Sequence, residues 1–129
     1  MKKYVAVVIA LAFAAAACNG SAEADEGSGS DRVRGPAFVE DVRFVFLESY
    51  PVQVRATIVG NLPTPCHEAV AEVTDSDGTT VTVDVYSLVD PQAVCAEVLD
   101  PFEVTVEVGS FETGEYVLII GDAEYPFTI

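Results

Sequence analysis

The sequence predicts an all-β domain, an antiparallel immunoglobulin/fibronectin-III-like sandwich of about seven to eight strands, behind a signal peptide and a disordered linker. From Pro36 onward, apolar residues alternate with polar ones, as Val81, Val83 and Val85 do. Successive side chains of a strand point to opposite faces of a sheet, so this period-two pattern indicates half-buried strands. Turn residues interrupt the runs about every ten residues, and helical spacing is not sustained. A small closed barrel is the alternative architecture.

Residues 1–17 are expected to form a secretory signal peptide. Lys2 and Lys3 give the chain a cationic start, and an unbroken apolar run extends from Tyr4 to Ala17. This is the pattern of a leader that directs export. A retained transmembrane helix is the weaker interpretation, because a span needs about 20 apolar residues. The sequence therefore predicts an exported protein.

Cys18 directly follows the leader and leaves two cleavage sites open. The small residues Ala15 to Ala17 suit ordinary signal peptidase, which would release a secreted protein. The same stretch resembles a bacterial lipobox, in which small residues precede a lipidated cysteine, although Ala15 stands where Leu is preferred. Three cysteines in an exported chain leave one unpaired, and lipidation of Cys18 lets Cys66 and Cys95 form a disulfide. We expect a lipoprotein attached to a membrane at Cys18.

Residues 18–35 are expected to be a flexible acidic linker that begins at this lipid anchor. The segment consists mainly of Ser, Gly, Ala and acidic residues, as in Glu23 to Ser30. Such a composition buries too little apolar surface to offset the entropy of ordering the chain. Random-coil scaling gives the linker a reach of about 20–25 Å.

The folded domain is expected over residues 36–129. We expect strands near residues 38–47, 51–59, 67–74, 79–88, 93–98, 102–108, 115–121 and 123–129. The chain has no Trp, and an antibody-type domain uses one in its core. The bulk of this core is expected instead from Phe44, Phe46, Tyr86, Phe102, Tyr116 and Phe127.

The acidic balance limits the class of partner. The chain has 21 acidic and 6 basic residues, a net charge of -15, and removal of Lys2 and Lys3 with the leader leaves -17. Nucleic acid binding requires Lys and Arg to neutralise phosphates, so nucleic acid is a poor partner. Like-charge repulsion that keeps the protein soluble is the simplest role of this charge. Adaptation to a saline habitat and loose binding of divalent cations are the alternatives.

Cys66 and Cys95 enclose 28 residues, and a disulfide that closes such a loop stabilises a fold by roughly 3–4 kcal/mol. His67 adjoins Cys66 and suggests a metal or redox pair as the alternative. The chain has no second His, so a tetrahedral metal site would need a carboxylate as its fourth ligand. A structural disulfide is the preferred interpretation, because small exported domains use cysteine in this way.

Catalytic signatures are weak throughout the chain. A Ser-His-acid triad would have to recruit His67, and the sequence contains no Gly-x-Ser-x-Gly elbow. Without Lys in the exported part, a Ser-Lys dyad is excluded. Paired carboxylates can perform glycoside hydrolysis, but in so acidic a chain their presence does not indicate that activity. We expect no enzyme, no catalytic residue and no cofactor.

The run from Asp75 to Gly78 begins like a calcium loop, because hard cations prefer several carboxylate oxygens from adjacent turns. Thr79 and Thr80 stand where further ligands should follow. Asp-Gly between two alternating runs favours a tight hairpin instead. Asp75 and Asp77 are therefore only weak metal candidates.

Five segments together resemble a set of uncharacterised bacterial exported domains. They are Glu48 to Val54, Gly60 to Cys66, Ala93-Val94-Cys95, Asp100-Pro101-Phe102-Glu103 and Gly114-Glu115-Tyr116. The resemblance covers roughly residues 40–129 and implies an extended, turn-rich β-domain and export, with no established activity. The Gly-x-Tyr segment also resembles part of small secreted proteinase-inhibitor sandwiches.

The sequence thus favours a non-catalytic envelope lipoprotein, an acidic β-sandwich that acts as a binding or structural module. Its partners are expected to be the membrane, through Cys18, and an unknown envelope or extracellular protein. The alternative is a secreted proteinase-inhibitor-like domain that presents a loop to an exported protease, at Asn61–Pro65 or Asp90–Ala93.

Overall fold

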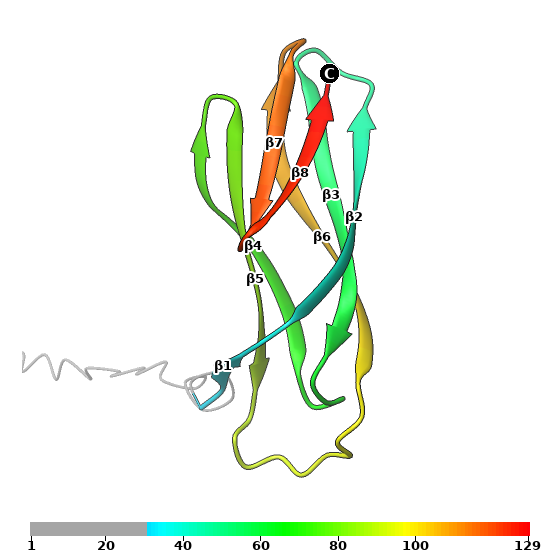
Figure 1. Ribbon diagram of the computed structural model, residues 1–129, viewed down its shortest axis with the longest axis vertical. Coiled ribbons are helices and arrows are strands. Elements are labelled where there is room, and N and C mark those ends of the chain that lie inside the picture. The colour runs from blue at the N-terminus through cyan, green and yellow to red at the C-terminus, as the bar shows by residue number, and fades with distance from the viewer. Residues whose placement is uncertain (1–30) are drawn as a thin grey trace, which may run out of the picture.

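The computed structural model describes residues 31–129, which form eight strands in two packed sheets (Figure 1). The strands are β1 (Val33–Gly35), β2 (Phe38–Leu47), β3 (Val52–Leu62), β4 (Glu68–Asp77), β5 (Thr80–Val89), β6 (Asp100–Phe111), β7 (Glu115–Ile120) and β8 (Ala123–Thr128). The expected signal peptide, the lipid attachment at Cys18 and the linker up to residue 30 lie outside the described residues. Within residues 31–129, no helix has the length and apolar character needed to cross a membrane.

One sheet has three strands in the order β2-β3-β6, and the other has five, with β5 paired to β4, β1 and β7, and β7 paired to β8. The expected β-sandwich is confirmed, but its sheets are not purely antiparallel. Strand β5 pairs with β7 in parallel, from Thr80 opposite Val117 to Val83 opposite Ile120. The reason is the connection through β6, which runs in the other sheet and reverses the chain direction before β7 begins.

The boundary between linker and domain falls earlier than expected. Residues 33–35 form β1, whereas the sequence placed them in the linker over 18–35. Strand β1 pairs with the end of β5, Val33 opposite Val89 and Gly35 opposite Ser87. Three residues carry too little pattern to predict a strand by themselves, and β1 forms because the exposed edge of β5 provides its pairing partner.

The prediction of a strand over residues 93–98 is wrong. These residues lie in the connection between β5 and β6 and form no strand. All of them except Glu97 are apolar, yet Val94 is 97% exposed. An apolar run alone does not produce a strand where the chain has neither a neighbouring strand nor an apolar layer to cover one face.

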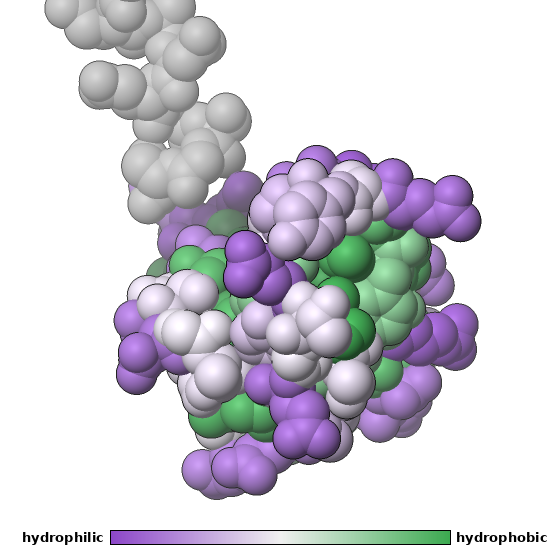
Figure 2. All heavy atoms as spheres, turned by 90° about the horizontal axis from the view of Figure 1, so that it is seen from above, coloured by the Kyte–Doolittle hydropathy of each residue, from purple (hydrophilic) through white to green (hydrophobic). Residues whose placement is uncertain are grey.

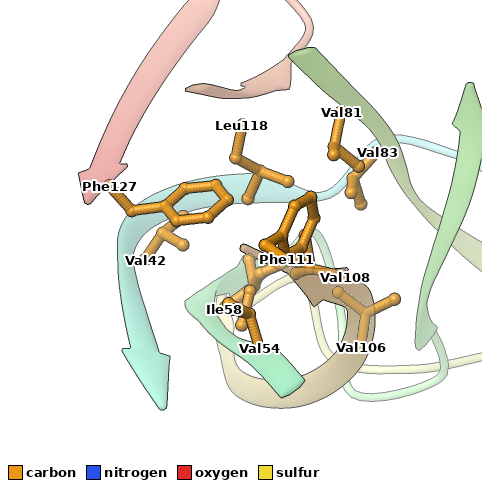
Figure 3. Packing of buried hydrophobic residues seen from close by; sticks show 11 residues of the cluster. Val42, Val54, Ile58, Val81, Val83, Val106, Val108, Phe111, Leu118 and Phe127 are labelled. Carbon is orange, nitrogen blue, oxygen red and sulfur yellow. The ribbon is translucent and has the colours of Figure 1, made fainter. Parts of the chain in front are cut away.

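The core lies between the sheets and is built mainly from the alternating valines (Figure 3). Its buried members are Val42, Val54, Ala56, Ile58, Val81, Val83, Val106, Val108, Phe111, Leu118 and Phe127. Phe111 and Phe127 contact each other edge to face, with ring centroids 5.4 Å apart. Two aromatic residues expected in the core do not belong to it: Phe46, near the end of β2, is 47% exposed, and the Tyr86 ring lies beneath the Arg34 guanidinium on the surface.

The hairpin predicted from Asp75 to Gly78 is confirmed. Strands β4 and β5 pair from Glu68 opposite Leu88 to Asp77 opposite Thr80, so the chain reverses at residues 78–79. Gly78 has a φ of 51°, in the left-handed region that glycine enters at little cost. The local turn chemistry was thus sufficient to predict this reversal.

Candidate functional site at the bridged loops

The Cys66–Cys95 disulfide, predicted from the sequence, joins two connections at one end of the sandwich. The first connection, residues 63–67, links β3 to β4, and the second, residues 90–99, links β5 to β6. The two cysteine Cα atoms are 6.0 Å apart. We call residues 63–67 and 90–99 the bridged loops, because the disulfide holds two segments distant in sequence side by side.

The first loop expected to face a partner, Asn61–Pro65, is only partly free to do so. Asn61 and Leu62 belong to β3. Leu62 is buried, and the Asn61 side-chain amide donates a 2.7 Å hydrogen bond to Glu40 on β2. The segment open to a partner therefore starts at Pro63.

Residues 64–67 form a turn held by its own polar groups. The His67 backbone N–H donates to the Thr64 carbonyl oxygen over 3.2 Å, and the Cys66 N–H donates to the Thr64 hydroxyl over 3.3 Å. The His67 Nδ1 atom lies 2.8 Å from the same hydroxyl. The His67 ring also packs beside Gly35 of β1, where a Cβ atom would approach it to 3.2 Å. These contacts give His67 a structural role in the turn and in the docking of β1.

The second loop begins with a turn at Asp90. The Asp90 side chain accepts the Gln92 N–H over 2.9 Å, and its carbonyl oxygen accepts the Ala93 N–H over 3.0 Å. Pro91 between them suits the second position of a turn. The segment Asp90–Ala93, expected to be a presenting loop, is exposed throughout.

Beyond that turn, the loop exposes three aliphatic side chains, and two of them lie in the segment 93–98 where the sequence predicted a strand. Val94 is 97% exposed, Leu99 62% and Val98 55%. Exposed apolar groups gathered on one short segment are typical of a surface that a partner covers. The Cys66–Cys95 disulfide restrains this loop before binding, so the loop would lose less conformational entropy when a partner binds.

The acidic metal candidates lie far from this arrangement in the topology. Asp75 and Asp77 belong to β4 beside the β4–β5 turn, opposite Thr82 and Thr80. Within residues 31–129, no group of three or more His, Cys, Asp or Glu side chains is placed to hold a metal ion.

Each arginine of the folded part is held by acidic side chains. The ion pairs are Arg32–Glu68, Arg34–Glu72, Arg34–Asp84, Arg43–Asp41 and Arg55–Glu107. Arg34 also stacks on Tyr86, 3.6 Å from the ring centroid. Its contact with the Tyr86 side chain, followed by the nearby Asp84 carboxylate, raises the pKa of Arg34 above its ordinary value. Figure 2, which views the sandwich end-on from above, shows hydrophilic residues around the rim and hydrophobic ones between them.

Residues 56–129, more than half of the chain, match the family of the ORF11 beta-sandwich domain. The protein belongs to this family. The matched region of the ORF11 beta-sandwich domain begins within β3, includes both bridged loops and ends at the last residue. The family confirms the β-sandwich expected from the sequence.

Similar proteins come from Herpetosiphon aurantiacus. An uncharacterized 10.2 kDa protein in the HgiCIIM 5′ region is 31% identical over 88 residues, which cover 65% of this chain and 90% of that protein. An uncharacterized 10.2 kDa protein in the HgiBIM 5′ region is 32% identical over 78 residues, which cover 57% and 92% respectively. No solved structure matches the chain. Both of these relatives of the ORF11 beta-sandwich domain are described as uncharacterized proteins.

Proposed function

We propose that the protein is a non-catalytic lipoprotein of the cell envelope, anchored through Cys18, whose bridged loops form the binding surface for an envelope or extracellular protein. The observation that carries the proposal is the pair of loops clamped by Cys66–Cys95, with Val94 97% exposed next to the bridge. An accessible segment that exposes aliphatic side chains and is tied to a stable sandwich by a disulfide is suited to binding.

The position of β1 supports a link between the anchor and this surface. Strand β1 pairs with residues 87–89 of β5, and the second bridged loop starts at residue 90. The chain that precedes β1 therefore joins the domain at the end that carries the bridged loops (Figure 1). With a linker reach of about 20–25 Å, this arrangement keeps the bridged loops near the membrane and favours a partner at its surface.

The anchor is tested by the intact mass of the protein from membrane and soluble fractions, with and without reductant. We expect a membrane-bound product that starts at Cys18, carries acyl groups, and gains roughly 2 Da on reduction of one disulfide. Cys18→Ser should move the protein to the soluble fraction. A wild-type protein that is soluble and unacylated, or that carries free thiols at Cys66 and Cys95, would contradict the proposal.

The exposed loop favours one alternative function, inhibition of an exported protease. Proteases bind extended and accessible segments. Residues 90–99 are mostly exposed, and the Cys66–Cys95 disulfide restrains them from rearranging when bound. The purified exported protein should then inhibit one class among serine, cysteine and metalloproteases, and Val94→Asp should abolish inhibition. Val45→Asp, at a 45% exposed site on β2, is the matched control. Absence of inhibition across the three classes removes this alternative.

A further inference from the structure

A second site, independent of the anchor and the bridged loops, lies along an edge of β5. Strand β4 occupies one edge of β5 over Thr80–Leu88. On the opposite edge, β7 pairs with Thr80–Val83 and β1 pairs with Ser87–Val89. Within the described part of the chain, residues 84–86 therefore have no strand beside them on that edge. Alternate residues of a strand direct their N–H and C=O groups to opposite edges, so at least one of the three presents both to the gap.

A cleft of about 380 Å³ opens at this gap, and we call it the β5 cleft. Its apolar wall comes from four half-buried residues that also pack against the core: Val39, Val85, Ile120 and Tyr125. The volume lies within the range of about 300–1,000 Å³ that is usual for ligand sites. The cleft thus combines a free sheet edge with an apolar wall that continues into the interior of the sandwich.

The charged groups that line the cleft are both acidic, Asp84 and Asp122. The Asp84 Oδ2 atom forms an ion pair with the Arg34 guanidinium over 3.1 Å. Asp122 is exposed and takes part in no ion pair within residues 31–129. The strongly negative net charge of the chain adds a field that attracts cations. Charge complementarity therefore selects a positively charged occupant.

We propose that the β5 cleft binds a short, extended segment of a partner protein that carries a lysine or an arginine. The segment pairs its backbone with residues 84–86, where three residues extend over about 10 Å. The aliphatic stem of the basic residue lies along Val85 and Ile120, and its charged head reaches the carboxylate of Asp122.

The test uses the peptides acetyl-Val-Lys-Val-amide and acetyl-Val-Glu-Val-amide, titrated into the ¹⁵N-labelled exported protein and followed by NMR. We expect saturable shifts of the amides of residues 84–86 and 120–123 with the lysine peptide, and about five- to ten-fold weaker binding of the glutamate peptide. No saturable shift, or equal binding of the two peptides, would overturn the proposal.

Variants separate a specific site from general attraction to an acidic surface. Asp122→Asn should weaken binding of the lysine peptide about three-fold. Asp77→Asn also removes one carboxylate charge, but beside the β4–β5 turn, and should leave the affinity for the lysine peptide unchanged. Ala123→Leu, which adds volume at a residue lining the cleft, should weaken binding without changing the rest of the amide spectrum. Equal effects of the two Asp variants would overturn the proposal, as would shifts confined to the bridged loops. The result is independent of whether Cys18 is acylated.

Discussion

Gly60 shows how closely the backbones of neighbouring strands approach in this sandwich. It lies opposite Val39, next to a register shift between Val39 and Asp41 on β2. A Cβ atom at Gly60 would overlap the backbone carbonyl of Phe38. Backbone cannot rotate away as a flexible side chain can, so the β2–β3 pairing requires glycine here.

Gly60→Ala should therefore lower the free energy of unfolding by about 1–3 kcal/mol, as overpacking in a well-packed region does. Chemical denaturation followed by circular dichroism measures the loss. The control is Gly114→Ala, where the new Cβ would lie 3.5 Å from the Tyr116 ring, an ordinary contact. If the two substitutions lower the free energy of unfolding equally, the close approach of the Phe38 carbonyl is not the reason that glycine is required at position 60.

Strand β1 is the smallest element of the fold and relies on side chains to stay in place. The buried Ser87 hydroxyl donates a 2.7 Å hydrogen bond to the Pro36 carbonyl oxygen just beyond the strand. Arg34 stacks on Tyr86 and pairs with Glu72 and Asp84. With only three ladder positions, β1 needs these contacts to remain docked on β5.

Arg34→Ala should loosen β1 while leaving most of the global stability intact. We expect faster hydrogen exchange at the amides of residues 33–35 and little change in the global free energy of unfolding, because the ion pairs are exposed. Arg55→Ala, which removes one exposed ion pair between β3 and β6, is the control. Unchanged exchange in β1 would show that its backbone pairing and Ser87 suffice.

The bridged loops depend on the disulfide in a different way, because neither of them contains a helix or a strand. Replacing both Cys66 and Cys95 with Ser should destabilise the fold by roughly 3–4 kcal/mol. Limited proteolysis should then cut within residues 90–99 before any strand is cut. Early cleavage at the β4–β5 turn instead would mean that the loop keeps its order without the bridge.

At the scale of the whole molecule, charge is the dominant property. The acidic residues far outnumber the arginines, each of which already has an acidic partner. The remaining carboxylates repel one another in the folded state, and this repulsion opposes the compact state most strongly at low ionic strength. The Debye length is about 30 Å at 0.01 M salt and about 10 Å at 0.1 M.

The melting temperature should therefore rise when KCl is increased from about 0.01 to 0.5 M, since screening weakens the repulsion. A gain of about 1 kcal/mol corresponds to roughly 4–8 °C in a domain of this size. The double variant Glu103→Gln with Glu124→Gln removes two exposed carboxylates and should reduce this salt dependence. A melting temperature that does not change with salt would show that repulsion between the surface carboxylates does not lower the stability of the fold.

Much of the architecture follows from local patterns that the chain carries by itself. The alternating Val81, Val83 and Val85 predict β5, and the Asp77-Gly78 turn predicts the hairpin that precedes it, because side-chain alternation and a left-handed glycine are properties of a few adjacent residues. The Cys66–Cys95 pair followed from the parity of three cysteines, with Cys18 expected to carry a lipid.

Tertiary structure decided the features that depend on pairing between distant segments. The parallel β5–β7 pairing, the docking of β1, the loop at 93–98 and the β5 cleft all depend on which strand edges are occupied. A sequence pattern shows which face of a strand is apolar, but edge pairing uses backbone groups that every residue type shares. The sequence alone therefore determined the charge and most of the strands, and the packed sheets decided where the chain leaves surfaces for a partner.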